Sequence, residues 1–95
     1  MDKTIYYNNL YDYYGELLTD KQKSYYEDYY FNDLSLAEIA ENNSVSRNAV
    51  HNQLKIAIEK LEYYEKILKL YEKRLKILEI IDKVEIDKNK IEELI

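Results

Sequence analysis

Apolar positions recur along residues 1–30 with the spacing of α-helices. Apolar pairs stand at positions 5–6, 10–11, 13–14 and 17–18, and four tyrosines follow at 25, 26, 29 and 30. Each set forms one broad apolar face on a helix. We expect Thr4 to cap the first helix and Thr19 or Asp20 to cap the second, because short side-chain oxygens accept hydrogen bonds from the free amides of a first turn.

The segment 35–61 carries the start signals of two further helices separated by a polar turn. Ser35 and Glu38 form an S-x-x-E capping box, in which each side chain accepts a hydrogen bond from the other residue's amide. Residues 42–44 (Asn-Asn-Ser) have turn chemistry, and Ser46 can cap the helix that follows. Two helices at this spacing predict a helix-turn-helix. The inward positions of its second helix are Val50, Leu54, Ala57 and Leu61.

From Ser46 to about Val84 the helical pattern continues without glycine or proline, which predicts one long helix. Its apolar residues repeat at the a and d positions of heptads, and this period favours a left-handed seam between helices. We expect a second copy of the chain to cover the seam and form a homodimer. The alternative is a helix that breaks near Tyr71 and folds back. The seam residues are Leu61, Tyr64, Leu68, Tyr71, Leu75 and Leu78.

The patterns give the chain a simple organisation. Residues 1–61 form a helical domain with the helix-turn-helix, residues 62–84 extend the long helix for dimerisation, and residues 85–95 are a weakly amphipathic tail. The 95 residues include one glycine and no proline, so nothing punctuates strands or hairpins. The predicted fold class is all-α, with a modest core.

Composition also limits the chemistry. The chain has no cysteine, which excludes disulfides and thiolate metal sites and is compatible with the reducing cytoplasm, where we expect the protein. Charged residues interrupt every apolar run, so we expect no membrane insertion. No glycine-rich loop could hold phosphates, and the single histidine has no evident nucleophile to activate. We expect neither an enzyme nor a bound cofactor or metal.

The net charge of −5 is unevenly distributed. Residues 1–35 carry seven acids and three bases, residues 36–60 carry three of each, and residues 61–95 carry nine acids and eight bases. The sequence pI is about 4.9, whereas a dedicated DNA-binding domain is usually basic. Since non-specific affinity for DNA comes from neutralising phosphates, that affinity should be weak.

The exposed start of the second helix of the helix-turn-helix supplies the first candidate site. In this motif the N-terminal residues of the second helix face the nucleic acid. Arginine can bind guanine and asparagine can bind adenine through paired hydrogen bonds, although the same residue types also occur on the surface of any helix. The candidate nucleic-acid-binding residues are Arg47, Asn48, His51, Asn52 and Lys55.

A stripe of basic residues further along is a weaker candidate for contacts with phosphates or with an acidic partner. The alternative is a solvated helix face with ion pairs four residues apart, such as Glu62–Lys66, Glu65–Lys69 and Glu72–Lys76. The basic stripe consists of Lys66, Lys69, Lys73, Arg74 and Lys76.

The chain also resembles known proteins. Leu18-Thr19, Gln22, Leu34-Ser35, the run Glu38-Ile39-Ala40, Val45-Ser46 and Val50 resemble region 4 of bacterial sigma factors. The stretch from Leu17 to Glu62, with the tyrosine-rich first helix before it, is similar to the YlxM family of small bacterial helix-turn-helix proteins. That family is regarded as a component or regulator of the signal recognition particle pathway.

This resemblance implies a non-catalytic adaptor or regulator of protein targeting that binds the particle's GTPase, its RNA, or both. The alternative is a helix-turn-helix transcription regulator that binds DNA. The turn departs from the sigma pattern, because Asn43-Ser44 stands where that pattern usually has Leu-Gly. Loss of the glycine and of an apolar anchor weakens the expectation of tight sequence-specific DNA binding.

Overall fold

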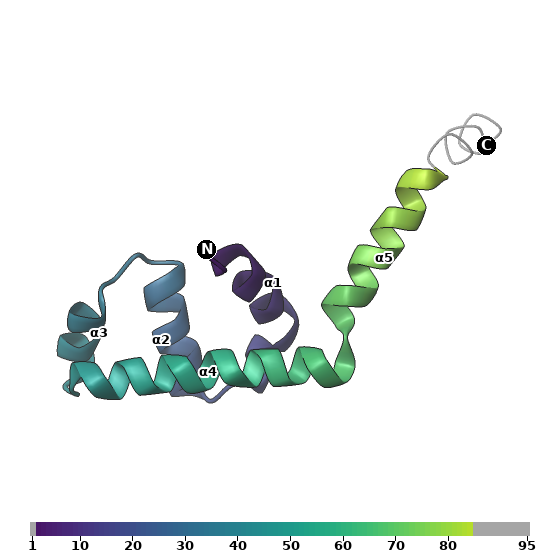
Figure 1. Ribbon diagram of the computed structural model, residues 1–95. Helices are drawn as coiled ribbons and strands as arrows, with labels where there is room; N and C mark the ends of the chain where they lie inside the picture. Colours follow the sequence, from purple (N-terminus) through teal and green to yellow (C-terminus); the bar gives the residue numbers. More distant parts are fainter. Residues whose placement is uncertain (1, 85–95) are drawn as a thin grey trace.

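The computed structural model describes residues 2–84, and over these residues the chain is helical with no strand. The all-α prediction is confirmed (Figure 1). The elements are α1 (Thr4–Tyr14), the 3₁₀-helix η1 (Gly15–Leu17), α2 (Asp20–Tyr30), α3 (Leu36–Asn43), α4 (Arg47–Leu68) and α5 (Leu70–Lys83).

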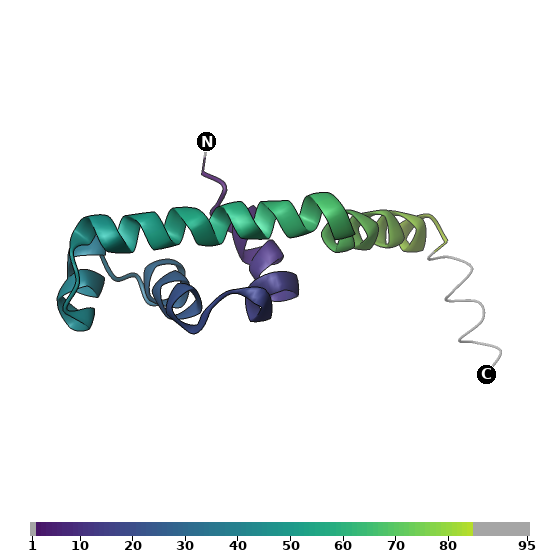
Figure 2. The same ribbon diagram turned by 90° about the horizontal axis from the view of Figure 1, so that it is seen from below.

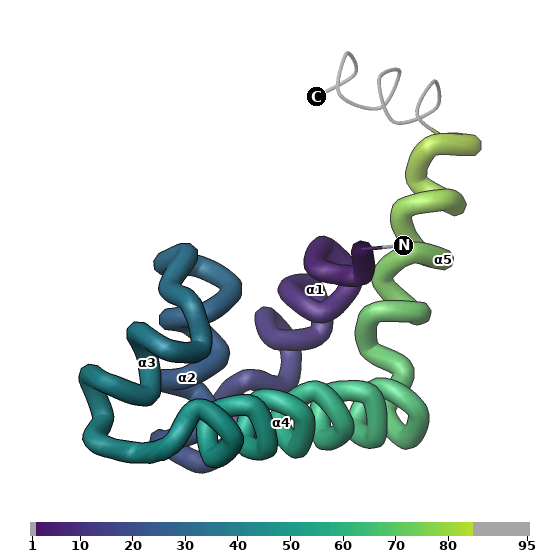
Figure 3. The backbone as a smooth tube through the Cα atoms, turned by 60° about the vertical axis from the view of Figure 1, so that its left-hand side comes forward, coloured from purple at the N-terminus to yellow at the C-terminus, as the bar shows by residue number. Residues whose placement is uncertain are grey.

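The helix α4 contacts each of the other α-helices. The helices α1 and α2 cross it side by side, and α3 packs at its N-terminal end (Figures 1 and 2). At the other end of α4 the chain turns into α5, which rises beside α1 in the view of Figure 3. The core therefore lies along one side of α4, between this helix and the three helices that precede it.

Tyrosine supplies much of that core. Tyr14 and Tyr26 are among its largest buried side chains, with exposed fractions of 1% and 0%. The ring of Tyr26 stacks on Tyr11 with 4.4 Å between centroids, and its hydroxyl donates to Asn8 Oδ1 at 2.7 Å. Each ring thus buries its apolar area while its hydroxyl keeps a hydrogen-bond partner. The remaining core residues are Leu10, Leu18, Tyr25, Ile39, Ala40, Val50, Leu54, Ala57 and Leu61.

Local capping signals account for the starts of three helices. Thr19 and Gln22 form a capping box before α2, and Ser35 and Glu38 form the one expected before α3. Ser46 Oγ accepts the amide of Ala49 at 3.0 Å and caps α4. These bonds satisfy amides that a helix leaves free at its first turn.

The cap predicted for α1 is wrong. Thr4 is the first residue of the helix, and its amide donates to Asp2 Oδ1 at 2.9 Å. The Thr4 hydroxyl also donates to this carboxylate oxygen. Asp2 satisfies the amide instead because a carboxylate two residues upstream reaches it as readily as a hydroxyl cap does, and its charge suits a helix N-terminus.

The single long helix expected over residues 46–84 is also wrong, because the chain breaks at Lys69, two residues before the position named in the alternative. This residue adopts φ 55° and ψ 32°, so α4 ends at Leu68 and α5 starts in a new direction. Left-handed backbone geometry is unfavourable for a residue other than glycine by about 1–2 kcal/mol. Contacts from elsewhere in the chain must therefore hold the break.

Glu65 and Tyr14 provide those contacts. Glu65 Oε1 accepts from the Tyr14 hydroxyl at 2.6 Å and from the Tyr71 amide at 3.1 Å, and Oε2 accepts from the Glu72 amide at 3.1 Å. The Tyr14 oxygen in turn accepts the Leu70 amide at 3.1 Å. Two side chains thus cap α5 across the break. Burial raises the pKa of Tyr14 to about 12, and its bond to Glu65 acts in the same direction, so the hydroxyl remains a donor at neutral pH.

The break divides the predicted seam. Leu61 is fully buried in the core, and Tyr71 packs edge-on against Tyr6 of α1 with 5.9 Å between ring centroids. Tyr64 is half-buried, whereas Leu68, Leu75 and Leu78 are exposed. The domain boundary placed at residue 61 falls inside α4, and the tail assigned to residues 85–95 lies outside the described residues. Dimerisation itself stays a prediction.

Candidate nucleic-acid interface

The helices α3 and α4 with their connecting turn form the predicted helix-turn-helix. Ile39 of α3 and Val50 of α4 are both fully buried, and Ala40 is 6% exposed. Small and branched side chains at these positions let the two helices pack closely at the turn. On α4, Leu54 and Ala57 continue the buried side toward α2 and α1, which leaves the opposite side of its first turns open to solvent.

The turn is held without the usual glycine. Ser44 takes φ 55° and ψ 42°, the left-handed conformation in which a C-terminal glycine would normally stand. The Val45 amide donates to the Ala40 carbonyl at 3.0 Å, and Asn43 Nδ2 donates to the Ile39 carbonyl at 2.7 Å. Asn43-Ser44 therefore satisfies the last carbonyls of α3, with some backbone strain at Ser44.

A Ser44→Gly substitution should relieve this strain. We expect the free energy of unfolding to rise by about 0.5–1 kcal/mol, because the lost left-handed penalty outweighs the added freedom of the unfolded chain. Urea unfolding followed by circular dichroism measures the change. A Ser44→Val variant should lose stability, since a β-branched residue tolerates positive φ poorly. Equal stability of the two variants would contradict the left-handed geometry of this turn.

The open side of α4 carries the predicted nucleic-acid-binding residues. We call Arg47, Asn48, His51, Asn52 and Lys55 the recognition face. All five are exposed on the first three turns of α4, and the structure therefore brings them together on one surface. Their helix is fixed by the buried residues behind it, so the face is rigid. Rigid placement is what recognition of base edges or phosphates requires.

The electrostatics of this face differ from those of the rest of the chain. Nineteen of the 95 residues are acidic, yet residues 42–58 contain no carboxylate and carry Arg47, Lys55 and His51. This is the longest stretch of the sequence without an acid. The turn and the start of α4 are thus the place where a polyanion meets the least repulsion.

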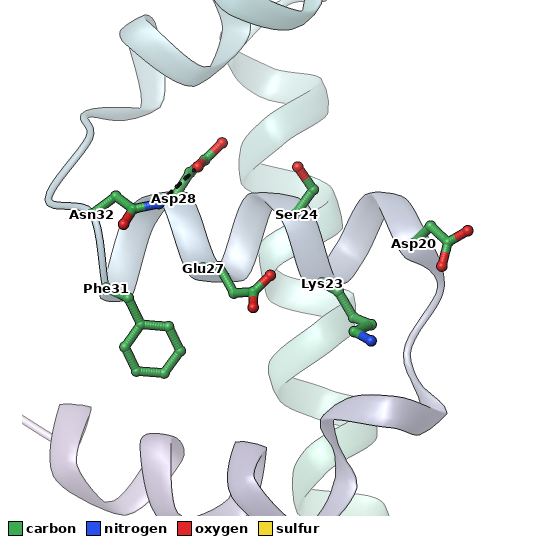
Figure 4. Close-up of a pocket in the computed structure, with 7 residues that line it drawn as sticks. All are labelled: Asp20, Lys23, Ser24, Glu27, Asp28, Phe31 and Asn32. Atoms are coloured by element: carbon green, nitrogen blue, oxygen red, sulfur yellow. Dashed lines mark hydrogen bonds between the residues drawn. The ribbon is translucent and has the colours of Figure 1, made fainter.

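The outer side of α2 has the opposite character. Figure 4 shows a shallow pocket there, with Asp20 at the start of the helix and Glu27 and Asp28 about two turns further on. Lys23 is already paired with Glu16 at 2.9 Å, and Asn32 donates to Asp28 at 3.1 Å. Phosphates would be repelled from this surface. The lining residues are Asp20, Lys23, Ser24, Glu27, Asp28, Phe31 and Asn32.

A second hollow, of about 500 Å³, adjoins the recognition face. His51 and Lys55 form part of its lining, together with residues of α2, α3 and the next turns of α4. Tyr29, which belongs to the apolar face predicted for residues 25–30, is 39% exposed in this hollow. The other lining residues are Tyr29, Tyr30, Leu36, Leu54, Ile58 and Glu59.

The basic stripe is not one continuous surface. Lys66 precedes the break and Lys69 is the break itself, whereas the other three members belong to α5. Lys76 pairs with Glu72 at 3.3 Å, and Lys73 and Arg74 line an open hollow beside Tyr13. Glu65, which was expected to pair with Lys69, caps α5 instead. All five basic side chains are exposed, but the bend separates them into two groups.

The described residues offer little else for chemistry. Within residues 2–84 no three His, Asp or Glu side chains are grouped so that they could hold a metal ion. No helix in the same range is long and apolar enough to span a bilayer.

The chain has many relatives. Residues 1–95 match the family UPF0122, described as "Putative helix-turn-helix protein, YlxM / p13 like". A UPF0122 protein of Oceanobacillus iheyensis is 47% identical over 92 residues, covering 94% of this chain and 88% of the relative. One of Caldanaerobacter subterraneus is 45% identical over 83 residues, covering 87% and 71%. One of Fusobacterium nucleatum is 41% identical over 97 aligned positions, covering 100% and 94%.

The family model and the Fusobacterium nucleatum relative match along the whole chain and so include the two helices and the turn described above. They confirm the resemblance to the YlxM family that the sequence motifs indicated. The chain belongs to the UPF0122 family of YlxM / p13-like helix-turn-helix proteins.

Proposed function

We propose that this protein is a non-catalytic regulator that binds nucleic acid through the recognition face of α4. The observation that carries the proposal is the coincidence of two features. The helix-turn-helix exposes Arg47, Asn48 and Asn52 at the place where the motif normally contacts nucleic acid, and the same stretch lacks carboxylates in an otherwise acidic chain.

The partner that we propose is the signal recognition particle in the cytoplasm, bound through its RNA, its GTPase, or both. The family resemblance supports this choice, and so does the charge. Duplex binding gains most of its affinity from several phosphate contacts. This face offers few cations, and the net charge of −5 opposes a long duplex. The loops and bulges of an RNA offer unstacked bases to protein side chains, so base contacts can contribute more to its recognition.

Duplex DNA is the second candidate, because the residue types of the recognition face favour it. Arg47 and Asn48 lie on the first turn of α4, which enters the major groove in helix-turn-helix complexes. Arginine and asparagine are the residues that most often bind guanine and adenine edges there. A transcription regulator would use the same face, so the two candidates differ in the ligand and not in the site.

The face is tested by a pair of matched variants. Arg47→Ala with Lys55→Ala should weaken binding of labelled signal recognition particle RNA by about tenfold or more, since each contact contributes about 1–3 kcal/mol. Lys3→Ala with Lys21→Ala also removes two exposed cations, away from the recognition face, and should leave the dissociation constant unchanged. Fluorescence titration measures both. Equal weakening by the two changes would mean that only overall charge matters and would contradict the face.

The same assay at about 50 and about 150 mM salt tests which ligand is bound, because the electrostatic part of the affinity falls steeply as the salt concentration rises between these values. Binding to the particle RNA, with or without its GTPase, should remain saturable at the higher salt and should resist competition by duplex DNA. Preference for duplex DNA would move the function to transcription. Loss of binding on charge reversal at Lys69 and Lys73, with the recognition face intact, would move the site to the basic stripe.

We also propose that the protein acts as a homodimer. The support is the apolar surface beyond the break, which the described part of the chain leaves open: Leu70, Ile77 and Leu78 are 40–56% exposed. Sedimentation equilibrium should give about twice the chain mass of 11.6 kDa at micromolar concentration. A monomer at those concentrations would contradict this proposal and would leave the assignment of the recognition face intact.

A further inference from the structure

The helix α5 has few partners within its own chain. None of its residues is buried, and six large apolar side chains between Leu70 and Ile81 are 40–60% exposed. A helix of 14 residues is marginal in water on its own, and most helices gain their stability by packing an apolar face. The cap from Glu65 fixes where α5 starts but covers none of this surface.

Four of these six residues lie with Val84 on one side of the helix, where Arg74 also lies, whereas Leu75 and Ile80 lie outside it. Leu70, Ile77 and Val84 follow each other at intervals of seven residues, and Leu78 and Ile81 lie beside them within about a third of the helix circumference. We call these five residues the α5 face. It differs from the seam expected from sequence, which used Tyr71, Leu75 and Leu78. At the N-terminal end of α5 the face borders an open, mainly apolar hollow of about 510 Å³, which Tyr13 of α1 helps to line.

We propose that the α5 faces of two copies of this chain pair with each other in antiparallel orientation. This inference rests on the proposed homodimer and specifies the surface and the direction of its helices. Charge supports the direction. Residues 69–76 carry four bases and one acid, whereas residues 77–84 carry two acids and one base. Antiparallel pairing sets the basic half against the partner's acidic half, and parallel pairing would set basic against basic.

The size of the surface supports a second copy as the occupant. A standard stable interface buries about 800 Å² on each partner, and toward such an area the α5 face contributes five exposed apolar side chains with Tyr13 beside them. Pairing centred on Ile77 brings the partner's Val84 next to Leu70, at the hollow beside Tyr13. A two-fold contact of this kind closes on itself and forms a dimer.

The arrangement bears on how the recognition faces are presented. Each α4 is about 33 Å long and leads away from the break, with its recognition face at the far end (Figure 1). Antiparallel α5 helices place the two breaks at opposite ends of the paired segment. The two recognition faces then lie at opposite ends of the dimer. Two recognition faces placed in this way suit two separate binding sites on nucleic acid better than adjoining operator half-sites one helical turn of DNA apart.

Two single-cysteine variants test the direction, because the natural chain has no cysteine. In an antiparallel pair centred on Ile77, an Ile77→Cys chain meets its own copy and should form a disulfide-linked dimer under mild oxidation. The Val84→Cys positions then lie about 20 Å apart, beyond the reach of a disulfide, and should not link. Linkage of both variants would show parallel pairing and overturn the proposal, as would linkage of the Val84→Cys variant alone.

Sedimentation equilibrium tests the surface. Ile77→Asp should raise the dimer dissociation constant at least about a hundredfold, because the two copies of this position meet and the change buries two like charges in the apolar contact. Leu68→Asp with Leu75→Asp, on the seam expected from the sequence, should change the dimer dissociation constant far less. Circular dichroism checks that α1–α4 remain helical in both. A dimer that survives the first change and yields to the second would overturn the α5 face and leave the homodimer standing, whereas a wild-type monomer would overturn both.

Discussion

A Tyr26→Ala variant should lose about 3–5 kcal/mol of unfolding free energy, the usual cost of deleting a large buried aromatic side chain. Tyr26 is fully buried, stacks on Tyr11 and donates to Asn8. Small domains have a total stability of about 5–15 kcal/mol, so much of the stability would be gone. Urea unfolding followed by far-ultraviolet circular dichroism measures the loss.

Two comparisons make this result specific. Tyr26→Phe keeps the ring and removes the hydroxyl, and it should cost only about 1 kcal/mol. Tyr63→Ala removes a ring that is 61% exposed. It should lower the unfolding free energy by no more than about 1 kcal/mol, the loss expected for Tyr26→Phe. Similar losses for Tyr26→Ala and Tyr63→Ala would contradict the assignment of the tyrosine cluster to the core.

The second large effect is expected at the break between α4 and α5. A Glu65→Ala variant should lose about 2 kcal/mol, because the Tyr14 hydroxyl and two amides of α5 lose their acceptor at once. The loss should be concentrated in α5. Hydrogen exchange of its amides should accelerate more than exchange of the amides in α3.

Glu59→Ala is the matched control, since Glu59 is an exposed carboxylate on the same helix. It should change stability by less than about 0.5 kcal/mol. If α4 and α5 formed one straight helix, Glu65 would have no part in capping. The two variants would then behave alike, which would contradict the bend at Lys69.

Short-range signals made much of the fold predictable. The capping box of Ser35 and Glu38 and the cap of Ser46 depend on residues three apart, so their chemistry can be recognised in the sequence. The apolar spacing correctly placed Val50, Leu54, Ala57 and Leu61 in the core. The helix-turn-helix follows from these signals together.

A break near Tyr71 was only the alternative expectation, and no short-range signal favoured it or marked Lys69. Lysine is a good helix former, and no glycine or proline marks the position. The bend is held by Tyr14, which is 51 residues from Glu65 in the chain, and by the packing of Tyr71 on Tyr6. Contacts at such separation become visible only once α1 lies across α4. The heptad spacing suggested a straight seam because it is a local pattern that ignores them.

The recognition face was predictable in position, because the motif itself determines which side of α4 is open. Its five residues are exposed together, as expected from their spacing. Which ligand they bind does not follow from residue types alone, since Arg47 and Asn48 suit RNA and DNA alike. The roles of Glu65 and Tyr14 at the start of α5 were missed, because a carboxylate and a phenol far apart in sequence give no joint signal.

Chemical-shift mapping tests the central claim most directly. Two-dimensional ¹H–¹⁵N spectra of the labelled protein would be recorded while signal recognition particle RNA is added at about 150 mM salt. We expect the largest shifts at residues 43–55, in the turn and the first turns of α4, with the outer side of α2 unaffected. Shifts centred on Lys66–Lys76, or none at saturating RNA, would contradict a nucleic-acid interface at the helix-turn-helix.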